Sequence, residues 1–247
     1  MDRVYGHNYY MRGSWEARAE TPNELAFRML RHIDLLRQID PLFASWLSGV
    51  SGPKKFETVR NSYAEIIAAR ISTDDWGEPL PIDGYWFGAI TRDQPGSLSY
   101  AVNIHAGAHK HTREFQNDAY FSTSSGFIPN PTAVTYRIFR SALFAIVEAW
   151  EPTDCIALPH ELLGFIGNRN YHFHEVWMQY LSAPLARLIT PPQTAIVDHL
   201  PNGGLLMSAT TETFKVDNPT HLAVARDIAA ATEPLNKLPC AHDPNLR

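Results

Sequence analysis

A run of apolar residues near the start of the chain has the spacing of a buried helix face. Its members are separated by four, four and three residues: Leu25, Met29, Ile33 and Leu36. Thr21 precedes the run, Pro22 follows at the first helical position, and Glu24 lies three residues after Thr21, which is the pattern of a capping box. The pattern predicts a helix that begins after Thr21, with an outward-facing pair between Glu24 and Arg28.

Other segments have the shorter period of strands. The aromatic residues of 5–10 predict a short strand that leads into a turn over residues 13–18. Three segments further along predict an antiparallel meander: 84–90, 98–104 and 119–123.

The second half of the chain alternates between the two kinds of element. Asn130 and Pro131 predict the start of a helix, and its apolar face follows at a helical period: Tyr136, Phe139, Leu143, Ile146 and Trp150. Residues 156–158 predict a strand, 162–164 an extended segment, and 177–181 fit either a helix or a strand.

Turn and cap residues delimit the remaining elements. Asn202 and Gly203 separate two apolar runs within residues 194–211, which predicts a β-hairpin. Asn218 and Pro219 predict the start of a last helix, and residues 54–71 predict a mixed helical segment.

These elements together predict an α+β fold, with a largely antiparallel sheet covered by helices on one face. Residues 1–247 are expected to form a single domain, with any internal boundary near residues 73–83 and a flexible tail at 239–247. Cys155 and Cys240 are far apart in the sequence, and reduced thiols are expected for a chain of this size.

Composition narrows the classes of function. The 247 residues are 45% hydrophobic and 19% charged, which is ordinary for a globular protein, and the net charge of −5 disfavours a nucleic-acid-binding protein. The amino-terminal residues have no basic and apolar pattern of a signal peptide, and no apolar run is long enough to span a bilayer. A cytoplasmic protein without membrane contact is therefore expected.

Histidines offer one candidate catalytic site. His105, His109 and His111 could hold a metal ion together with Asp118 or Glu175, which would make the chain a metal-dependent hydrolase. His172 and His174 would share a face if that segment were extended. However, the helical His-Glu-x-x-His pattern is absent, and scattered surface histidines explain the spacing equally well.

An acidic segment offers a second candidate site. Asp74, Asp75 and Glu78 surround Trp76, and paired carboxylates of this kind serve hydrolases when they lie in a cleft. A solvent-exposed acidic loop is the more ordinary explanation.

The remaining motifs give no active site. Cys155 and His160 form no recognisable nucleophilic pair, no serine lies in a Gly-x-Ser-x-Gly elbow, and no phosphate loop or dinucleotide fingerprint is present. No cofactor is expected.

Several short motifs resemble one protein family. The first contains Tyr10, Trp15, Glu16, Arg18 and Glu20 and is followed by the capped helix and by Ile39-Asp40-Pro41-x-Phe43-x-x-Trp46. The carboxyl-terminal half adds three motifs: Trp177-x-x-Tyr180-Leu181-Ser182, Leu200-Pro201-Asn202-Gly203-Gly204-Leu205-Leu206 and Thr210-Thr211-Glu212-x-Phe214-x-x-Asp217-Asn218-Pro219. In this order and spacing the motifs resemble the immunity protein 52 family of bacterial polymorphic-toxin and type VI secretion systems. One departure is Glu16, which stands where that family usually has glycine.

The resemblance implies a protein without catalytic activity that binds and neutralises a cognate toxin effector, expected to be a restriction-endonuclease-like nuclease. An acidic chain suits a basic, DNA-cleaving partner because opposite charges steer association. The candidate partner-binding residues are those of the first motif and of the acidic segment: Trp15, Glu16, Arg18, Glu20, Asp74, Asp75, Trp76 and Glu78. For the first motif a purely structural role, as a turn that fixes the first helix, is an equal alternative.

Overall fold

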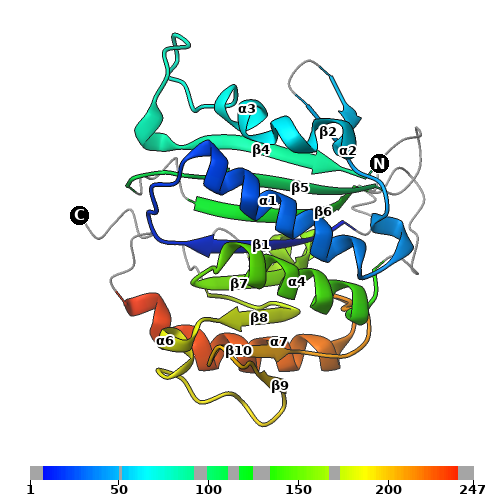
Figure 1. Cartoon of the computed structure of the whole chain (residues 1–247). Coiled ribbons are helices and arrows are strands. Elements are labelled where there is room, and N and C mark those ends of the chain that lie inside the picture. Colours follow the sequence, from blue (N-terminus) through cyan, green and yellow to red (C-terminus); the bar gives the residue numbers. More distant parts are fainter. Residues whose placement is uncertain are drawn as a thin grey trace.

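A single large sheet lies at the centre of the computed structural model, which describes residues 8–49, 52–91, 99–110, 117–124, 134–166 and 173–238. The strand order across the sheet is β3-β2-β4-β5-β6-β1-β7-β8-β10-β9 (Figure 1). The strands are β1 (Tyr9–Trp15), β2 (Leu47–Ser48), β3 (Lys54–Lys55), β4 (Tyr85–Ile90), β5 (Ser99–Ala106), β6 (Asn117–Ser124), β7 (Asp154–Pro159), β8 (Met178–Leu181), β9 (Ile196–His199) and β10 (Leu205–Ser208). All pairings between these strands are antiparallel.

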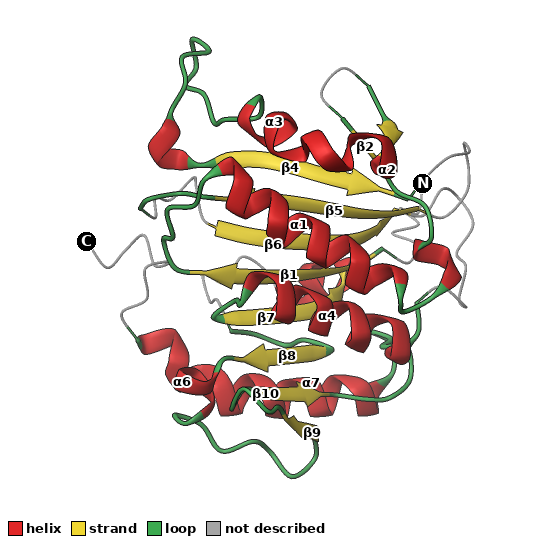
Figure 2. Ribbon diagram, in the orientation of Figure 1, coloured by secondary structure: helices red, strands yellow, loops and turns green. Residues whose placement is uncertain are grey.

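The α-helices of the described residues are α1 (Pro22–Arg37), α2 (Phe56–Val59), α3 (Tyr63–Ala68), α4 (Tyr136–Trp150), α5 (His160–Ile166), α6 (Ala183–Ala186) and α7 (Pro219–Thr232). Figure 2 shows α1 and α4 side by side across one face of the central strands, while α7 runs along the β8–β10 end. The predicted α+β fold with a largely antiparallel, helix-covered sheet is confirmed. None of the helices in the described part of the chain is long and apolar enough to cross a membrane.

The central strand β1 explains why α4 lies where it does. Tyr9 packs edge-to-face on Phe139 of α4, and Trp15 stacks on Trp150, with ring centroids 5.8 and 5.6 Å apart. Between them, a Cβ atom on Gly13 would lie 2.7 Å from Cγ2 of Ile146, so only a glycine lets the helix approach this closely. The buried face of α4 is therefore seated on one face of β1.

The caps and the hairpin turn that the sequence predicts are present at the ends of the outer elements. Thr21 accepts a hydrogen bond from the amide of Glu24, and the Glu24 carboxylate accepts one from the amide of Thr21, so the predicted capping box is confirmed. Asn218 caps α7, and the hairpin of β9 and β10 turns at Asn202 and Gly203 as predicted. Arg28 was expected to pair with Glu24, but its ion pairs are with Glu20 and Glu151.

Several local predictions need correction. Residues 162–164 lie in α5 and are not extended, because a short apolar run has no period that distinguishes the two states. The helix predicted from Asn130 is described from Tyr136, with Thr135 as its N-cap; residues 130 and 131 lie outside the described part. Strand β1 continues to Trp15 into the predicted turn, and residues 54–71 divide into a short strand and separate helical turns.

The segment 73–83 was the predicted place of any internal domain boundary. Strands on both sides of the 73–83 segment pair within the same sheet, since Leu47 of β2 faces Ile90 of β4. Residues 239–247, including Cys240, lie outside the described residues.

A buried histidine links the two central helices. His32 of α1 is fully buried, and its Nδ1 accepts a hydrogen bond from the indole N–H of Trp150 at 3.0 Å. Burial lowers the pKa of His32 from 6.5 to about 3, so the imidazole stays neutral in the folded protein.

This burial predicts a loss of stability in mild acid. Below pH 6.5 the unfolded chain binds a proton at His32 that the folded chain does not, so the free energy of unfolding falls as the pH falls towards 3. We expect the wild type to lose about 2 kcal/mol more than His32→Asn between pH 7 and pH 5, measured by urea unfolding at both pH values. Asparagine keeps an acceptor for Trp150, and equal losses in the two proteins would contradict the prediction.

Candidate functional site

The first motif of the sequence lies at the junction of β1, α1 and the carboxyl end of α4. Trp15 is buried, with 2% of its surface exposed, so its indole is part of the core. Glu16 is exposed, and its backbone carbonyl accepts a hydrogen bond from the side chain of Asn117 at 3.0 Å. The amide of Arg18 donates to the carbonyl of Ala108 at 3.0 Å, which ties the linker to the end of β5.

Two arginines and two carboxylates form a compact network beside this linker. Glu20 accepts ion pairs from Arg18 at 2.9 Å and from Arg28 at 2.5 Å, and its side chain is only 7% exposed. Arg28 also pairs with Glu151 at 3.0 Å, where α4 ends in a left-handed residue. The fold thus brings the motif residues Arg18 and Glu20 together. Arg28 and Glu151 complete the network, and the sequence shows only that they lie on or next to helices.

The same arginines cap the carboxyl end of α4. Arg18 donates to the carbonyl of Trp150 at 3.0 Å, and Arg28 donates to that of Ala149 at 2.9 Å. The last carbonyls of a helix lack intrahelical partners and carry partial negative charge, so guanidinium groups satisfy both needs. The geometry is what a structural role for Arg18 and Glu20 requires.

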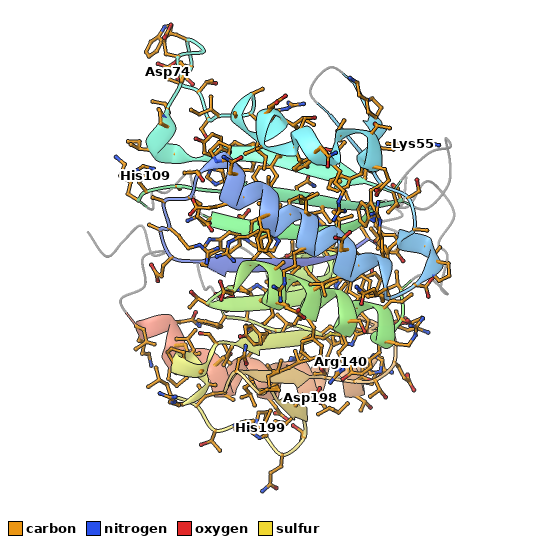
Figure 3. The ribbon with its side chains drawn as sticks, viewed as in Figure 1. Lys55, Asp74, His109, Arg140, Asp198 and His199 are labelled. Carbon is orange, nitrogen blue, oxygen red and sulfur yellow. The ribbon has the colours of Figure 1, made fainter. Side chains whose placement is uncertain are left out.

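The acidic segment forms a separate feature at the edge of the molecule. Asp74, the residue labelled there in Figure 3, lies on a turn that projects beyond the helical layer. One oxygen of its side chain accepts the amides of Trp76 at 2.9 Å and Glu78 at 2.8 Å. Thr73 and Pro79 pair across the base of the turn, and Gly77 supplies a positive φ of 86°. These bonds hold the turn in one conformation.

The turn presents an aromatic side chain to solvent. Trp76 is 85% exposed, and Asp75 and Glu78 are exposed beside it. Exposed tryptophan is uncommon on a surface that has no partner, whereas tryptophan is enriched among the residues that contribute most to protein interfaces. The two groups of predicted partner-binding residues therefore differ: Trp15, Arg18 and Glu20 are packed into the fold, whereas Trp76 and its acidic neighbours lie on an exposed turn.

The histidine site is not assembled among the described residues. His105 is buried on β5 under the indole of Trp86, and its Nε2 donates to the carbonyl of Asp83 at 2.6 Å. His109 is exposed on a loop (Figure 3), and His111 and His172 lie outside the described part. Within that part, no three histidine, cysteine or acidic residues gather closely enough to hold a metal ion.

Of the two acidic residues considered with these histidines, Asp118 has its carboxylate in an ion pair, and Glu175 contacts His174 through its backbone carbonyl. Asp118 pairs with Arg12 at 3.0 Å, and burial raises the pKa of Asp118 although Arg12 and His105 oppose this. The carbonyl of Glu175 lies 2.9 Å from Nδ1 of His174. Cys155 is a buried free thiol whose pKa is raised by burial, which is the opposite of an activated nucleophile.

The geometry defines an α+β protein with an exposed, aromatic-bearing turn, and comparison with known proteins gives its family. The family model of immunity protein 52 matches residues 7–236, so the chain belongs to that family. A comparison with curated proteins found no significant match.

Among solved structures, the fold is similar to that of a Pseudomonas aeruginosa type VI secretion system (T6SS) protein, PA0821. The TM-score is 0.52 at 10% sequence identity, and the alignment covers 91% of this chain and 73% of the other. At this identity the likeness concerns the fold alone.

Removal of the Glu20 carboxylate should destabilise the protein more than removal of the exposed Glu148 carboxylate on α4. Glu20→Ala leaves Arg18 and Arg28 facing each other in a partly buried place, and we expect a loss of about 2–4 kcal/mol in the free energy of unfolding. The matched control is Glu148→Ala, which breaks the exposed pair with Arg31 and should cost less than about 1 kcal/mol. Denaturant unfolding measures both, and equal losses would argue against a structural network.

Proposed function

We propose that this chain is an immunity protein that binds a cognate secreted toxin effector and neutralises it, so that the producing cell is protected. The observation that carries the proposal is the match to the immunity protein 52 family, which covers nearly the whole chain. The fold shared with a type VI secretion system protein supports the same setting. The chain acts in this proposal by occupying a surface of the effector, without catalysis or a cofactor.

The effector in this proposal is a nuclease with a basic surface. The chain carries a net charge of −5, and its displayed turn concentrates Asp74, Asp75 and Glu78 around one tryptophan. A nuclease must attract phosphates, so an acidic protein that approaches its substrate site is favoured by the same field. Opposite charges would raise the association rate, and burial of the aromatic side chain would slow dissociation.

Among the candidate partner-binding residues, we propose that the turn of residues 74–78 makes the contact with the effector. Its hydrogen bonds fix the backbone before binding, so little conformational freedom is lost when Trp76 enters a pocket of the partner. Glu16 is exposed to solvent, whereas Trp15, Arg18 and Glu20 support the fold that carries these groups.

Neutralisation is testable with the purified effector encoded beside this protein. We expect the wild-type chain to abolish cleavage of plasmid DNA by the effector at about one-to-one stoichiometry, and its co-expression to rescue growth of a host that produces the toxin. Unchanged toxicity and unchanged cleavage in excess of this chain would refute the proposed function. Rescue of a toxin that does not cleave DNA would keep the immunity role and refute the nuclease.

Trp76 should contribute strongly to effector binding. Trp76→Ala is expected to weaken the dissociation constant about 10- to 100-fold, because it removes the largest exposed apolar side chain of the turn. The matched control is Phe27→Ala, which removes another exposed aromatic side chain, on α1, and is expected to leave the affinity within about threefold. Calorimetry or interferometry with the purified effector measures both, and equal affinities for the wild type and Trp76→Ala would exclude the turn as the main contact.

A further inference from the structure

The sheet has a second face that the helices α1 and α4 do not cover. Residues 9, 11, 13 and 15 of β1 point towards α4, so the alternate residues Tyr10 and Arg12 point to the opposite side. Directly paired residues of neighbouring strands lie on the same side of a sheet. The register therefore places two rows that reach solvent on this opposite side across β4, β5, β6 and β1: Gly88–Asn103–Tyr120–Arg12 and Ile90–Ala101–Ser122–Tyr10. A third row on the same side, Trp86–His105–Asp118–Ser14, is buried apart from Trp86.

This surface, which we call the open face, is accessible to solvent in its β4–β1 part. Asn103 is exposed, and Trp86 at its border is 47% exposed while its ring stacks on His105. The other members of the two rows are half-buried. In contrast, the corresponding residues of β7, β8 and β10 are buried, including Ile156, Gln179 and Met207.

The residues of the open face are those that protein-binding surfaces favour. Tyr10, Tyr120 and Trp86 supply rigid aromatic area, while Asn103 and Ser122 supply groups that donate and accept hydrogen bonds. The guanidinium of Arg12 lies over the ring of Tyr120 at 5.4 Å and pairs with Asp118, so the centre of this surface is close to neutral. An extended nucleic-acid backbone finds no row of cations here, whereas a protein surface finds aromatic and polar groups.

A pocket hollows the open face at β4 and β5. Its volume is about 560 Å³, and five of its lining residues are open-face residues or border them: Trp86, Gly88, Ile90, Ala101 and Asn103. Gly49 and Pro53 also line the pocket, and Arg70 lies at its rim. Arg70 is exposed, donates to the carbonyl of Gly49 at 3.1 Å, and is the charged residue among the described lining residues.

The chemistry of this pocket selects its occupant. A mostly apolar lining with one guanidinium and one amide at its edge suits an apolar side chain that is accompanied by a carboxylate. The volume accommodates one or two side chains, and is too small for a helix or a domain.

We propose that the open face receives a loop of the effector, with an apolar anchor residue in the pocket and a neighbouring acidic residue on Arg70. This inference rests on the proposed function and assigns it a second contact surface, distinct from the displayed turn. The two surfaces are connected through the backbone: the amide of Trp86 donates to the carbonyl of Arg70 at 2.9 Å, and Ile71 pairs with Tyr85 just before the turn begins. The turn and the pocket therefore both adjoin the start of β4, and we expect one effector to contact both.

The test uses the full chain and the purified effector encoded beside it. Asn103→Arg introduces a long charged side chain at an exposed position of the open face, and Arg70→Glu reverses the charge at the rim. We expect each to weaken the dissociation constant by about tenfold or more. Asn23→Arg, the same change as the first variant at an exposed position of α1, should stay within about threefold of the wild type.

The outcomes separate this inference from the proposed function. If the wild type binds and Asn103→Arg binds within about threefold of it, the open face is not a contact surface and the inference is overturned. If Asn103→Arg weakens binding and Arg70→Glu does not, the acidic anchor is refuted. If the wild type itself leaves the effector unbound, the proposed function fails and this inference fails with it. Thermal unfolding of each variant verifies that the fold is retained.

Discussion

The packing of β1 on α4 is the contact on which the other parts of the structure depend. The strand is the sixth of ten in the sheet order, so it joins the β3–β6 side to the β7–β9 side. Its odd-numbered residues must match the helix closely, and Gly13 provides the space that Ile146 fills. Because protein interiors are close-packed, this contact determines the distance of α4 from the sheet and the direction of its axis. The helix in turn fixes α1 through His32 and Trp150.

The alternation of side chains along β1 also determines which residues lie on the opposite face of the sheet. If one set of alternate residues in β1 is committed to the core, the other set must serve the opposite face. In β7, β8 and β10 the residues of that face are buried, whereas in the β4–β1 half the face bears tyrosines, an asparagine, a serine and an arginine that remain in contact with solvent. The fold thus places the buried contacts with α1 and α4 on one face of β1 and leaves the opposite face of the β4–β1 half for the contact that we propose.

The sequence allowed most of the fold to be predicted, and the reasons are local. The capping box at Thr21, the Asn-Gly turn at 202–203 and the Asn218 cap depend on neighbours within a few residues, so their signals are complete in the chain itself. The segment 162–164 was misassigned because three apolar residues have no resolvable period. The pairing of Arg28 with Glu20 and Glu151, in place of Glu24, depends on where α4 ends, and helix spacing alone does not contain that information.

The candidate site shows the same division between local and long-range information. The acidic turn was visible as a cluster of four residues, although its rigidity depends on the hydrogen bonds of Asp74. The first motif was visible as a pattern, but whether it is displayed or packed could be decided only from the position of Trp150. The open face could not be found at all, because its residues come from four strands and are individually unremarkable.

Under the proposed function, a binding protein gains from carrying its contact residues on rigid parts of the fold. The tightest protein complexes lose little conformational entropy on association, since both surfaces are formed beforehand. Here the turn is held by Asp74 and by the pairing of Thr73 with Pro79, and the open face is made of strands whose side chains are limited by their neighbours. Both are anchored in the same β4 strand, so a partner that engages one surface brings the other to a high effective concentration. In the proposal, two modest contacts on one rigid sheet together supply the affinity for the effector, without a large apolar patch that would promote self-association.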